Sequence, residues 1–201
     1  MGTIPIESPS NTQTAAEGVG FLLQRQYTGV IERANVSAKE LIELLLRDIT
    51  LLVPRSLAKF SRPPGLHGAL KVGDELHIQI LMAGKCSVRV IEITPHSFTL
   101  LTLSDHPEAG RISFAVRERD DGKYLDLRIR SRARSGSIYQ LLGYLFLGKV
   151  MQTRVWIQCI KNAAFAAGGN IVGKVQVHTM RVDVKTDDAV RDAGSTFETF
   201  F

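Results

Sequence analysis

The sequence predicts an α+β fold in which a curved antiparallel β-sheet carries one long C-terminal α-helix across its concave side. Three observations predict it: a β-hairpin signal over residues 111–130, a proline-free helical segment over 137–167, and a series of short strand-like runs before the hairpin. Consecutive strands with short connections favour an antiparallel sheet, and a helix that follows them can bury its apolar face on that sheet.

The hairpin has the clearest signature. Residues 111–119 and 124–130 alternate between apolar and polar side chains, and Asp121-Gly122 lies between the two runs. An Asp-Gly pair favours a two-residue turn with positive φ angles, which fixes the register of the strands. This register pairs Val116 with Leu127, Phe114 with Ile129, and Arg117 with Asp126. One face of the hairpin is therefore apolar and needs a cover, whereas the other face is charged.

The segment 137–167 supplies that cover. It is long enough for a helix, and the glycines at 168–169 give a stop signal. At about 100° per residue, its apolar side chains form a stripe that includes Phe146 and Trp156. We expect this stripe to face the sheet.

Two polar residues, Lys149 and Thr153, fall in the same stripe. An unpaired lysine buried against the sheet would be costly, so Lys149 must extend to water, form an ion pair or face a wet cavity. In a cavity, this ammonium group and this hydroxyl group would orient the acidic or carbonyl end of an apolar ligand. The alternative is that Lys149 lies at the margin of an ordinary core.

The remaining elements follow from local signals. Ser37 and Glu40 form a capping box, which starts a helix that must end before Pro54. A short second helix is expected at 55–60. The hydrophobic pattern then predicts strands at 22–31, 75–82, 86–93, 97–103 and 171–184.

The composition is that of an ordinary globular protein, with 201 residues, 22% charged residues and a net charge of +5. We expect a flexible lead-in at 1–20, a main domain at 21–169 and a C-terminal extension at 170–201 that can add a strand. The lead-in lacks the features of a signal peptide and no run is apolar enough to span a membrane, so we expect a cytoplasmic protein. Cys86 and Cys159 are expected to be reduced core residues.

The middle of the chain resembles a known family. The shared pattern is a leucine, a short gap, His-Pro-Glu, a small residue, a glycine and a phenylalanine, here Leu103, His106, Pro107, Glu108, Ala109, Gly110 and Phe114. It resembles the "nineteen-ninety" domain-of-unknown-function family, a branch of the START, polyketide-cyclase and birch-pollen-allergen (SRPBCC) superfamily. The resemblance covers about residues 27–169. It implies a helix-grip, START-like fold that often encloses an apolar cavity, and it implies no activity.

Three residues in one strand connection could carry chemistry: Asp105, His106 and Glu108. A histidine titrates near neutral pH, so His106 could act as a general base with a carboxylate that orients it. The simpler interpretation, which we favour, is that Asp105 and Glu108 accept hydrogen bonds from loop amides in a tight turn. His67 and His77 are expected to be solvated or core residues, and no spacing in the chain is that of a zinc site.

Four arginines, Arg128, Arg130, Arg132 and Arg134, recur at every second position and so project from one face of a strand. They could bind phosphate groups or anionic lipids. No aromatic residues alternate with them, as binding of single-stranded nucleic acid would require. We therefore favour a solvated convex face and expect no nucleic-acid partner.

The leading hypothesis for function is non-catalytic binding of a small apolar ligand with a carboxylate or carbonyl end. We expect its cavity to be lined by Phe114, Val116, Leu127, Ile129, Phe146, Lys149, Thr153 and Trp156. One alternative is a cyclase-like or hydrolase-like enzyme that uses His106 and Glu108, which requires both side chains to point inward. Another is an interaction or structural protein, including a homo-oligomer formed through the C-terminal extension. No cofactor and no metal are expected.

Overall fold

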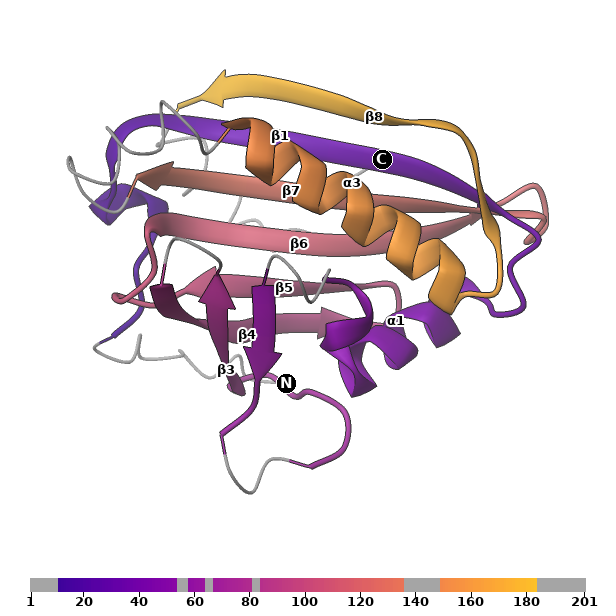
Figure 1. Cartoon of the computed structure of the whole chain (residues 1–201), viewed down its shortest axis with the longest axis horizontal. Helices are drawn as coiled ribbons and strands as arrows, with labels where there is room; N and C mark the ends of the chain where they lie inside the picture. The colour runs from indigo at the N-terminus through magenta and orange to yellow at the C-terminus, as the bar shows by residue number, and fades with distance from the viewer. Residues whose placement is uncertain (1–10, 54–57, 64–66, 81–83, 136–148, 184–201) are drawn as a thin grey trace, which may run out of the picture.

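The computed structural model describes residues 11–53, 58–63, 67–80, 84–135 and 149–183. These residues form one curved antiparallel sheet of eight strands in the order β2-β3-β4-β5-β6-β7-β1-β8 (Figure 1). The strands are β1 (Val19–Glu32), β2 (Ala58–Ser61), β3 (Glu75–Ile80), β4 (Gly84–Thr94), β5 (Ser97–Thr102), β6 (Glu108–Arg119), β7 (Tyr124–Ser135) and β8 (Asn170–Val182). The predicted α+β class and the antiparallel sheet are confirmed.

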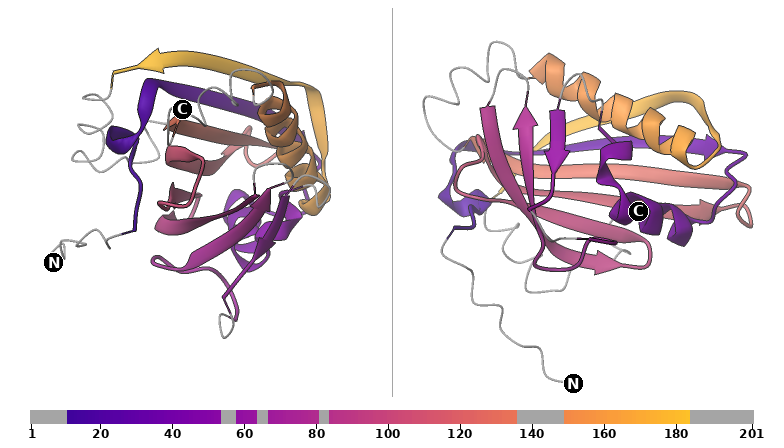
Figure 2. Two further views of the ribbon diagram at one scale, coloured as in Figure 1. Left: turned by 60° about the vertical axis from the view of Figure 1, so that its left-hand side comes forward. Right: turned by 60° about the horizontal axis from the view of Figure 1, so that its bottom comes forward.

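The two α-helices, α1 (Ala38–Arg47) and α3 (Lys149–Ala166), lie on the concave side of the sheet (Figure 2). Two 3₁₀ turns accompany them, η1 (Ala15–Glu17) and η2 (Ile49–Leu51). The core fills the space between the helices and the sheet. In the described part of the chain, no helix has the length and hydropathy that crossing a membrane requires.

The hairpin of β6 and β7 has the predicted register. Val116 pairs with Leu127, Phe114 with Ile129, and Arg117 with Asp126. Asp121 and Gly122 at the tip have φ angles of 54° and 84°, as a turn of this type requires. The apolar side chains of both strands therefore share the concave face.

Helix α1 begins at the predicted capping box. The Ser37 hydroxyl accepts a hydrogen bond from the Glu40 amide at 3.2 Å, and the Glu40 carboxylate accepts one from the Ser37 amide at 2.8 Å. The helix then buries Leu41, Ile42 and Leu45 against the sheet. These contacts close one end of the concave face.

Helix α3 approaches the sheet closely where β1 has a glycine. A Cβ atom at Gly29 would lie 2.4 Å from Ile160 Cγ2, so only glycine allows this contact. The helix ends before Gly168, whose φ of 71° confirms the predicted stop. Of the predicted segment 137–167, the structure describes a helix over Lys149–Ala166, and 137–148 lie outside the described residues.

The predicted short helix at 55–60 is wrong over the residues that the structure describes. Residues 58–61 form strand β2, in which Phe60 pairs with Ile78 of β3. So short a segment has little helical stability of its own, and pairing with β3 decides its conformation. Residues 54–57 lie outside the described part of the chain.

Both ends of the described chain contact the sheet. Thr12 forms a bridge with Leu103, and Ala15 is only 3% exposed, so residues 11–17 already pack in the region expected to be a flexible lead-in. The strand predicted at 171–184 is present as β8, which pairs with β1. The proposed division at residues 20 and 169 stays a prediction.

The two cysteines are free and buried, as predicted. Burial raises the pKa of the Cys86 thiol and of the Cys159 thiol to about 12. Both thiols are therefore protonated at neutral pH, and a protonated, buried thiol is a poor nucleophile.

Candidate functional site

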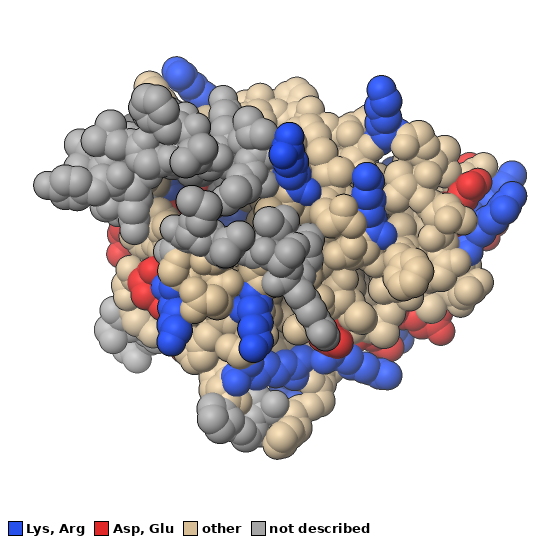
Figure 3. Space-filling model, in the orientation of Figure 1, with Lys and Arg blue, Asp and Glu red and all other residues tan. Residues whose placement is uncertain are grey.

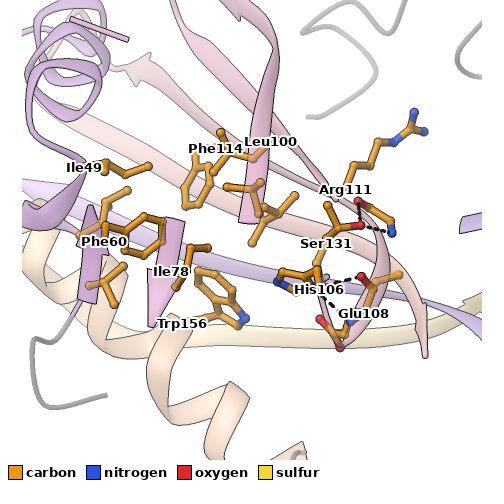
Figure 4. A pocket seen from close by; sticks show the side chains of 17 residues that line it. Ile49, Phe60, Ile78, Leu100, His106, Glu108, Arg111, Phe114, Ser131 and Trp156 are labelled. Carbon is orange, nitrogen blue, oxygen red and sulfur yellow. Dashed lines mark hydrogen bonds between the residues drawn. The ribbon is translucent and has the colours of Figure 1, made fainter. Parts of the chain in front are cut away.

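A cavity of about 80 Å³ lies on the concave face, between the sheet and Trp156 of α3 (Figure 4). Most of its wall is apolar and comes from strands β2 to β6, from helix α3, and from η2 with the two residues after it. The apolar side chains are Ile49, Leu52, Val53, Phe60, Ile78, Val88, Leu100, Ile112, Phe114 and Trp156. Because these positions are brought together by strand pairing and helix packing, the cavity is a product of the whole fold.

Aromatic side chains form one part of this wall. The rings of Phe98 and Phe114 stack with centroids 4.6 Å apart, and Trp156 meets Phe114 edge-on at 6.2 Å. Both arrangements are favourable for aromatic pairs. Phe98 and Phe114 are buried, whereas Trp156 is partly exposed at the edge of the core.

The other end of the cavity is polar, with His106 and Glu108 in its wall. The His106 Nδ1 atom lies 3.0 Å from the backbone nitrogen and 3.0 Å from the carbonyl oxygen of Glu108. Figure 4 shows the ring turned toward Ile78 and Trp156, with these bonds on its other side. Burial lowers the pKa of His106, more than the nearby carboxylates raise it, so the neutral ring is favoured.

Glu108, at this polar end, forms a buried ion pair with Arg25. The Glu108 carboxylate lies 3.7 Å from Nη1 of Arg25, whose side chain is only 6% exposed. Arg25 is on the concave face because it pairs with Ser131 of β7, a cavity residue. The charge of Glu108 at the cavity wall is therefore partly balanced from within the protein.

Asp105 has a structural role. Its carboxylate accepts hydrogen bonds from the Ser87 amide at 2.9 Å and from the Ser87 hydroxyl at 2.8 Å. Thr102 holds the same connection by accepting a hydrogen bond from the Gly110 amide at 2.9 Å. These bonds fix the turn that places His106 and Glu108 at the cavity. The donor residue belongs to strand β4 and not to the loop itself, and the Glu108 carboxylate pairs with Arg25 instead of with loop amides.

The residues expected to line the cavity divide into three groups. Phe114 and Trp156 do line it. Val116, Leu127 and Ile129 are fully buried on the same concave face but do not border this cavity.

The third group consists of Phe146, Lys149 and Thr153. Thr153 is half-buried beside Tyr27, where burial raises the pKa of the tyrosine hydroxyl and the Thr153 side chain partly offsets that rise. Lys149 is the first residue of α3, but its side chain lies outside the described residues, as does all of Phe146. Their roles in ligand binding stay predictions.

Sequence reasoning missed several cavity residues. Ile78 and Leu100 lie on strands that were predicted, so their alternation could have indicated them. Leu23, Arg25 and Tyr27 are two residues apart in a predicted strand, so their side chains share one face. This spacing could have indicated that the Arg25 side chain points toward the core. Phe60 had no such signal, because its segment resembled a helix.

The four predicted arginines lie on the convex side. The registers place Arg128 opposite Ala115 and Arg130 opposite Ser113, as predicted. Arg134 donates hydrogen bonds to the carbonyl oxygens of Gly20 and Ala15 and so turns toward η1. The other three are half-buried on the convex side.

Solved structures show the same fold with little sequence identity. A conserved protein from Geobacillus kaustophilus has a TM-score of 0.54 and 15% identity, over 77% of this chain and 99% of that one. A hypothetical protein from Helicobacter pylori has a TM-score of 0.52 and 7% identity, over 71% and 86%. A point mutant of norcoclaurine synthase from Thalictrum flavum has a TM-score of 0.51 and 8% identity, over 74% and 96%.

At these identities, the likeness to the solved structures concerns the fold alone. A search of curated proteins found no match to the chain. A family model described as "Domain of unknown function (DUF1990)" matches residues 59–185, which is more than half of the 201 residues. The chain therefore belongs to the DUF1990 family of domains of unknown function.

Proposed function

We propose that this protein binds a small, mostly apolar molecule in the cavity between the sheet and α3, without changing it chemically. The observation that supports this function is the cavity wall, in which apolar side chains surround a space that ends in His106 and Glu108. A concave apolar site with a few fixed polar groups is the usual form of a small-molecule site. The apolar wall would supply affinity, and the polar end would set the orientation of the ligand.

The volume limits the size of the ligand. Sites for drug-sized molecules enclose about 300–1,000 Å³, and an engineered cavity of about 150 Å³ holds benzene. At about 80 Å³, this cavity accommodates a short chain or part of a ring. A larger ligand would have to displace a wall residue, and Trp156 is suited to this because it is partly exposed.

The helix-grip arrangement belongs to the same proposal. In it, α3 is the C-terminal part of one long helix that starts near residue 137, and the sheet curves round it. Lys149 and Thr153 would then lie along the ligand and orient an acidic or carbonyl end.

The test uses Trp156, which is the chain's single tryptophan. Protein purified under native conditions is compared with denatured protein by mass spectrometry to find a co-purified molecule. Trp156 fluorescence and thermal stability are then followed while short-chain alcohols, phenols and short-chain fatty acids are added. We expect a saturable fluorescence change and a higher melting temperature with at least one of these classes.

Two variants make the test specific. Ala133→Leu adds carbon atoms at the cavity wall and should abolish the fluorescence response while the protein stays folded. Lys149→Ala should weaken only ligands with an acidic end. A protein that carries no ligand and responds to no compound would contradict the proposal.

A second candidate function is favoured by one observation, that both His106 and Glu108 border the cavity. In a proton-transfer enzyme, the neutral His106 ring would exchange a proton with the ligand and Glu108 would stabilise the charge that develops. His106→Gln and Glu108→Gln would then remove turnover of a bound ligand but leave its binding intact. If the original protein turns over no ligand and the two variants lose binding, the result would support the first proposal instead.

A further inference from the structure

The two ring nitrogens of His106 have different surroundings. Nδ1 lies 3.0 Å from the backbone nitrogen and 3.0 Å from the carbonyl oxygen of Glu108. Figure 4 shows these bonds on the side of the ring away from Ile78 and Trp156, so Nε2 is the nitrogen directed toward the apolar part of the cavity. No hydrogen bond joins Nε2 to any residue that the structure describes.

The backbone amide of Glu108 decides which nitrogen of the neutral ring carries the proton. A backbone N–H group can only donate, and this amide donates to Nδ1 at 3.0 Å. A proton on Nδ1 would face the amide hydrogen and leave the amide without an acceptor, which proteins tolerate less often than a carbonyl oxygen with an unused lone pair. Burial lowers the pKa of His106, so the ring is neutral at neutral pH. The neutral ring therefore carries its proton on Nε2, and it offers the cavity a donor and no lone pair.

Two further donors border the same cavity, the indole N–H of Trp156 and the hydroxyl of Ser131. An indole nitrogen can only donate, and a hydroxyl can donate or accept. No hydrogen bond among the described residues uses either group. The wall therefore has hydrogen atoms to give to a ligand, which favours a ligand that carries an acceptor.

The charged groups at the polar end favour an uncharged ligand. The Glu108 carboxylate lies 3.7 Å from Nη1 of Arg25, so the arginine charge is already matched by a carboxylate of the protein. Arg111 also borders the cavity, but Figure 4 shows its side chain extending away from it. A ligand carboxylate would meet the like charge of Glu108 and would need a cation, whereas a carbonyl oxygen needs only a donor.

We propose that the ligand is an uncharged carbonyl compound, a short-chain ketone or ester, whose oxygen accepts a hydrogen bond from Nε2–H of His106. This inference rests on the proposed function and deepens it, because it names the class of ligand and the atom that recognises it. The carbonyl oxygen would lie at the polar end, and the carbon chain would lie along the apolar wall. The orientation of the ligand is thereby assigned to His106 and not to Lys149.

The first measurement determines which ring nitrogen is protonated. Long-range proton–nitrogen correlation spectra of the full, ¹⁵N-labelled chain distinguish protonated from bare ring nitrogens. The His106 signals are those that His106→Gln removes. At neutral pH we expect a protonated Nε2 and a bare Nδ1. A proton on Nδ1, or on both nitrogens, would overturn the inference.

The second measurement compares butanone with its methylene analogue, in which =CH₂ replaces the oxygen, by NMR titration. His106→Phe keeps a ring but removes the N–H group, so it should weaken butanone at least about fivefold more than it weakens the methylene analogue. His106→Asn keeps an acceptor for the Glu108 amide but has no donor at the position of Nε2, and it should show the same selective loss. His67→Phe, at an exposed histidine, is the matched control and should change neither affinity.

Butanoate tests whether the ligand is uncharged. Figure 3 shows basic side chains at the surface on the side of α3, where a carboxylate can associate outside the cavity. Arg154→Gln with Lys161→Gln removes two exposed cations of α3 and measures that background. We expect butanoate to bind in the cavity more weakly than butanone. Butanoate that binds more tightly, through Lys149, would overturn this inference and support the proposed function.

The remaining outcomes also separate the inference from the proposed function. Equal weakening of butanone and its methylene analogue by both His106 variants would overturn the inference alone, because a ligand would still bind but its oxygen would not be recognised. Binding of none of the three probes would overturn the inference as well. Combined with the absence of any co-purified molecule, that result would contradict the proposed function.

Discussion

The two faces of strand β7 have opposite properties although their residues alternate along one chain. Leu127 and Ile129 point to the concave side and have no exposed surface. Arg128 and Arg130 point to the convex side and are half-buried, and Arg130 contacts Gln26 of β1 through polar atoms. The same backbone thus supplies the core on one side and a charged surface on the other.

This difference shows where the fold is encoded. The concave side chains must fill the space under α1 and α3, so their size and apolarity are constrained by packing. On the convex side, partial burial and the neighbouring positive charges of Arg128, Arg132 and Arg111 lower the pKa of Arg130 to about 10. The convex side chains are held instead by polar contacts, as Arg130 is by the Gln26 side-chain oxygen.

The largest expected effect tests this contrast at neighbouring positions. Leu127→Ala removes a fully buried side chain and should lower the free energy of unfolding by about 2–5 kcal/mol. Arg128→Ala, at a half-buried position, should lower it by about 1 kcal/mol. Urea unfolding followed by circular dichroism measures both values. Similar losses for the two variants would show that the convex face also holds the fold together.

Helix packing on the concave face can also be weakened by adding a side-chain atom where the packing is tight. Gly29→Ala places a Cβ atom 2.4 Å from Ile160 Cγ2 and should cost about 1–3 kcal/mol. Because the clash is with one side chain, Ile160→Ala in the same protein should make the Gly29 substitution much less costly. A double-mutant cycle measures this coupling. Independent costs at the two positions would mean that α3 does not approach β1 as closely as described.

Much of the concave face could be predicted from the sequence because its determinants are local. The Asp-Gly turn fixed the register of Phe114 with Ile129, and the capping box located the start of α1. Alternation along each strand then separated the inward from the outward side chains. Each of these signals lies within a few residues of the feature that it predicts.

The cavity itself could not be predicted in the same way. Phe60, Ile78 and Leu100 meet there because β2, β3 and β5 bend round the core, and no local pattern encodes that curvature. Strand β2 has only four residues, so its local sequence pattern is too short to distinguish a strand from a helix. Its pairing with β3 decides the conformation, and that pairing is not visible in the local sequence. The hydrogen-bond partners of Arg130 and Arg132, which are Gln26 and Gln24, likewise come from a strand about one hundred residues away in sequence.

A smaller effect is expected at the start of α1, which covers one end of the concave face. Ser37→Ala removes the acceptor for the Glu40 amide and should cost about 1 kcal/mol. Ser37→Asp keeps an acceptor at the cap and should cost much less. The difference in urea midpoint between the two variants measures the contribution of the cap. Equal midpoints would mean that packing of Leu41 and Leu45 alone determines where the helix begins.

The last effect concerns pH, and it tests whether the polar end of the cavity belongs to the dry concave side. Burial lowers the pKa of His106 in the folded protein, whereas in the unfolded chain it titrates near about 6.5. As pH falls below that value, the unfolded chain takes up a proton that the folded protein does not, so stability decreases until the pH passes the folded pKa. The loss is about 1.4 kcal/mol for each unit by which the pKa is lowered. Urea unfolding between about pH 5.5 and 7 should therefore show a slope that His106→Gln removes and that His67→Gln, at an exposed histidine, retains. A slope unchanged by His106→Gln would place the His106 ring in water and would remove it from the cavity wall.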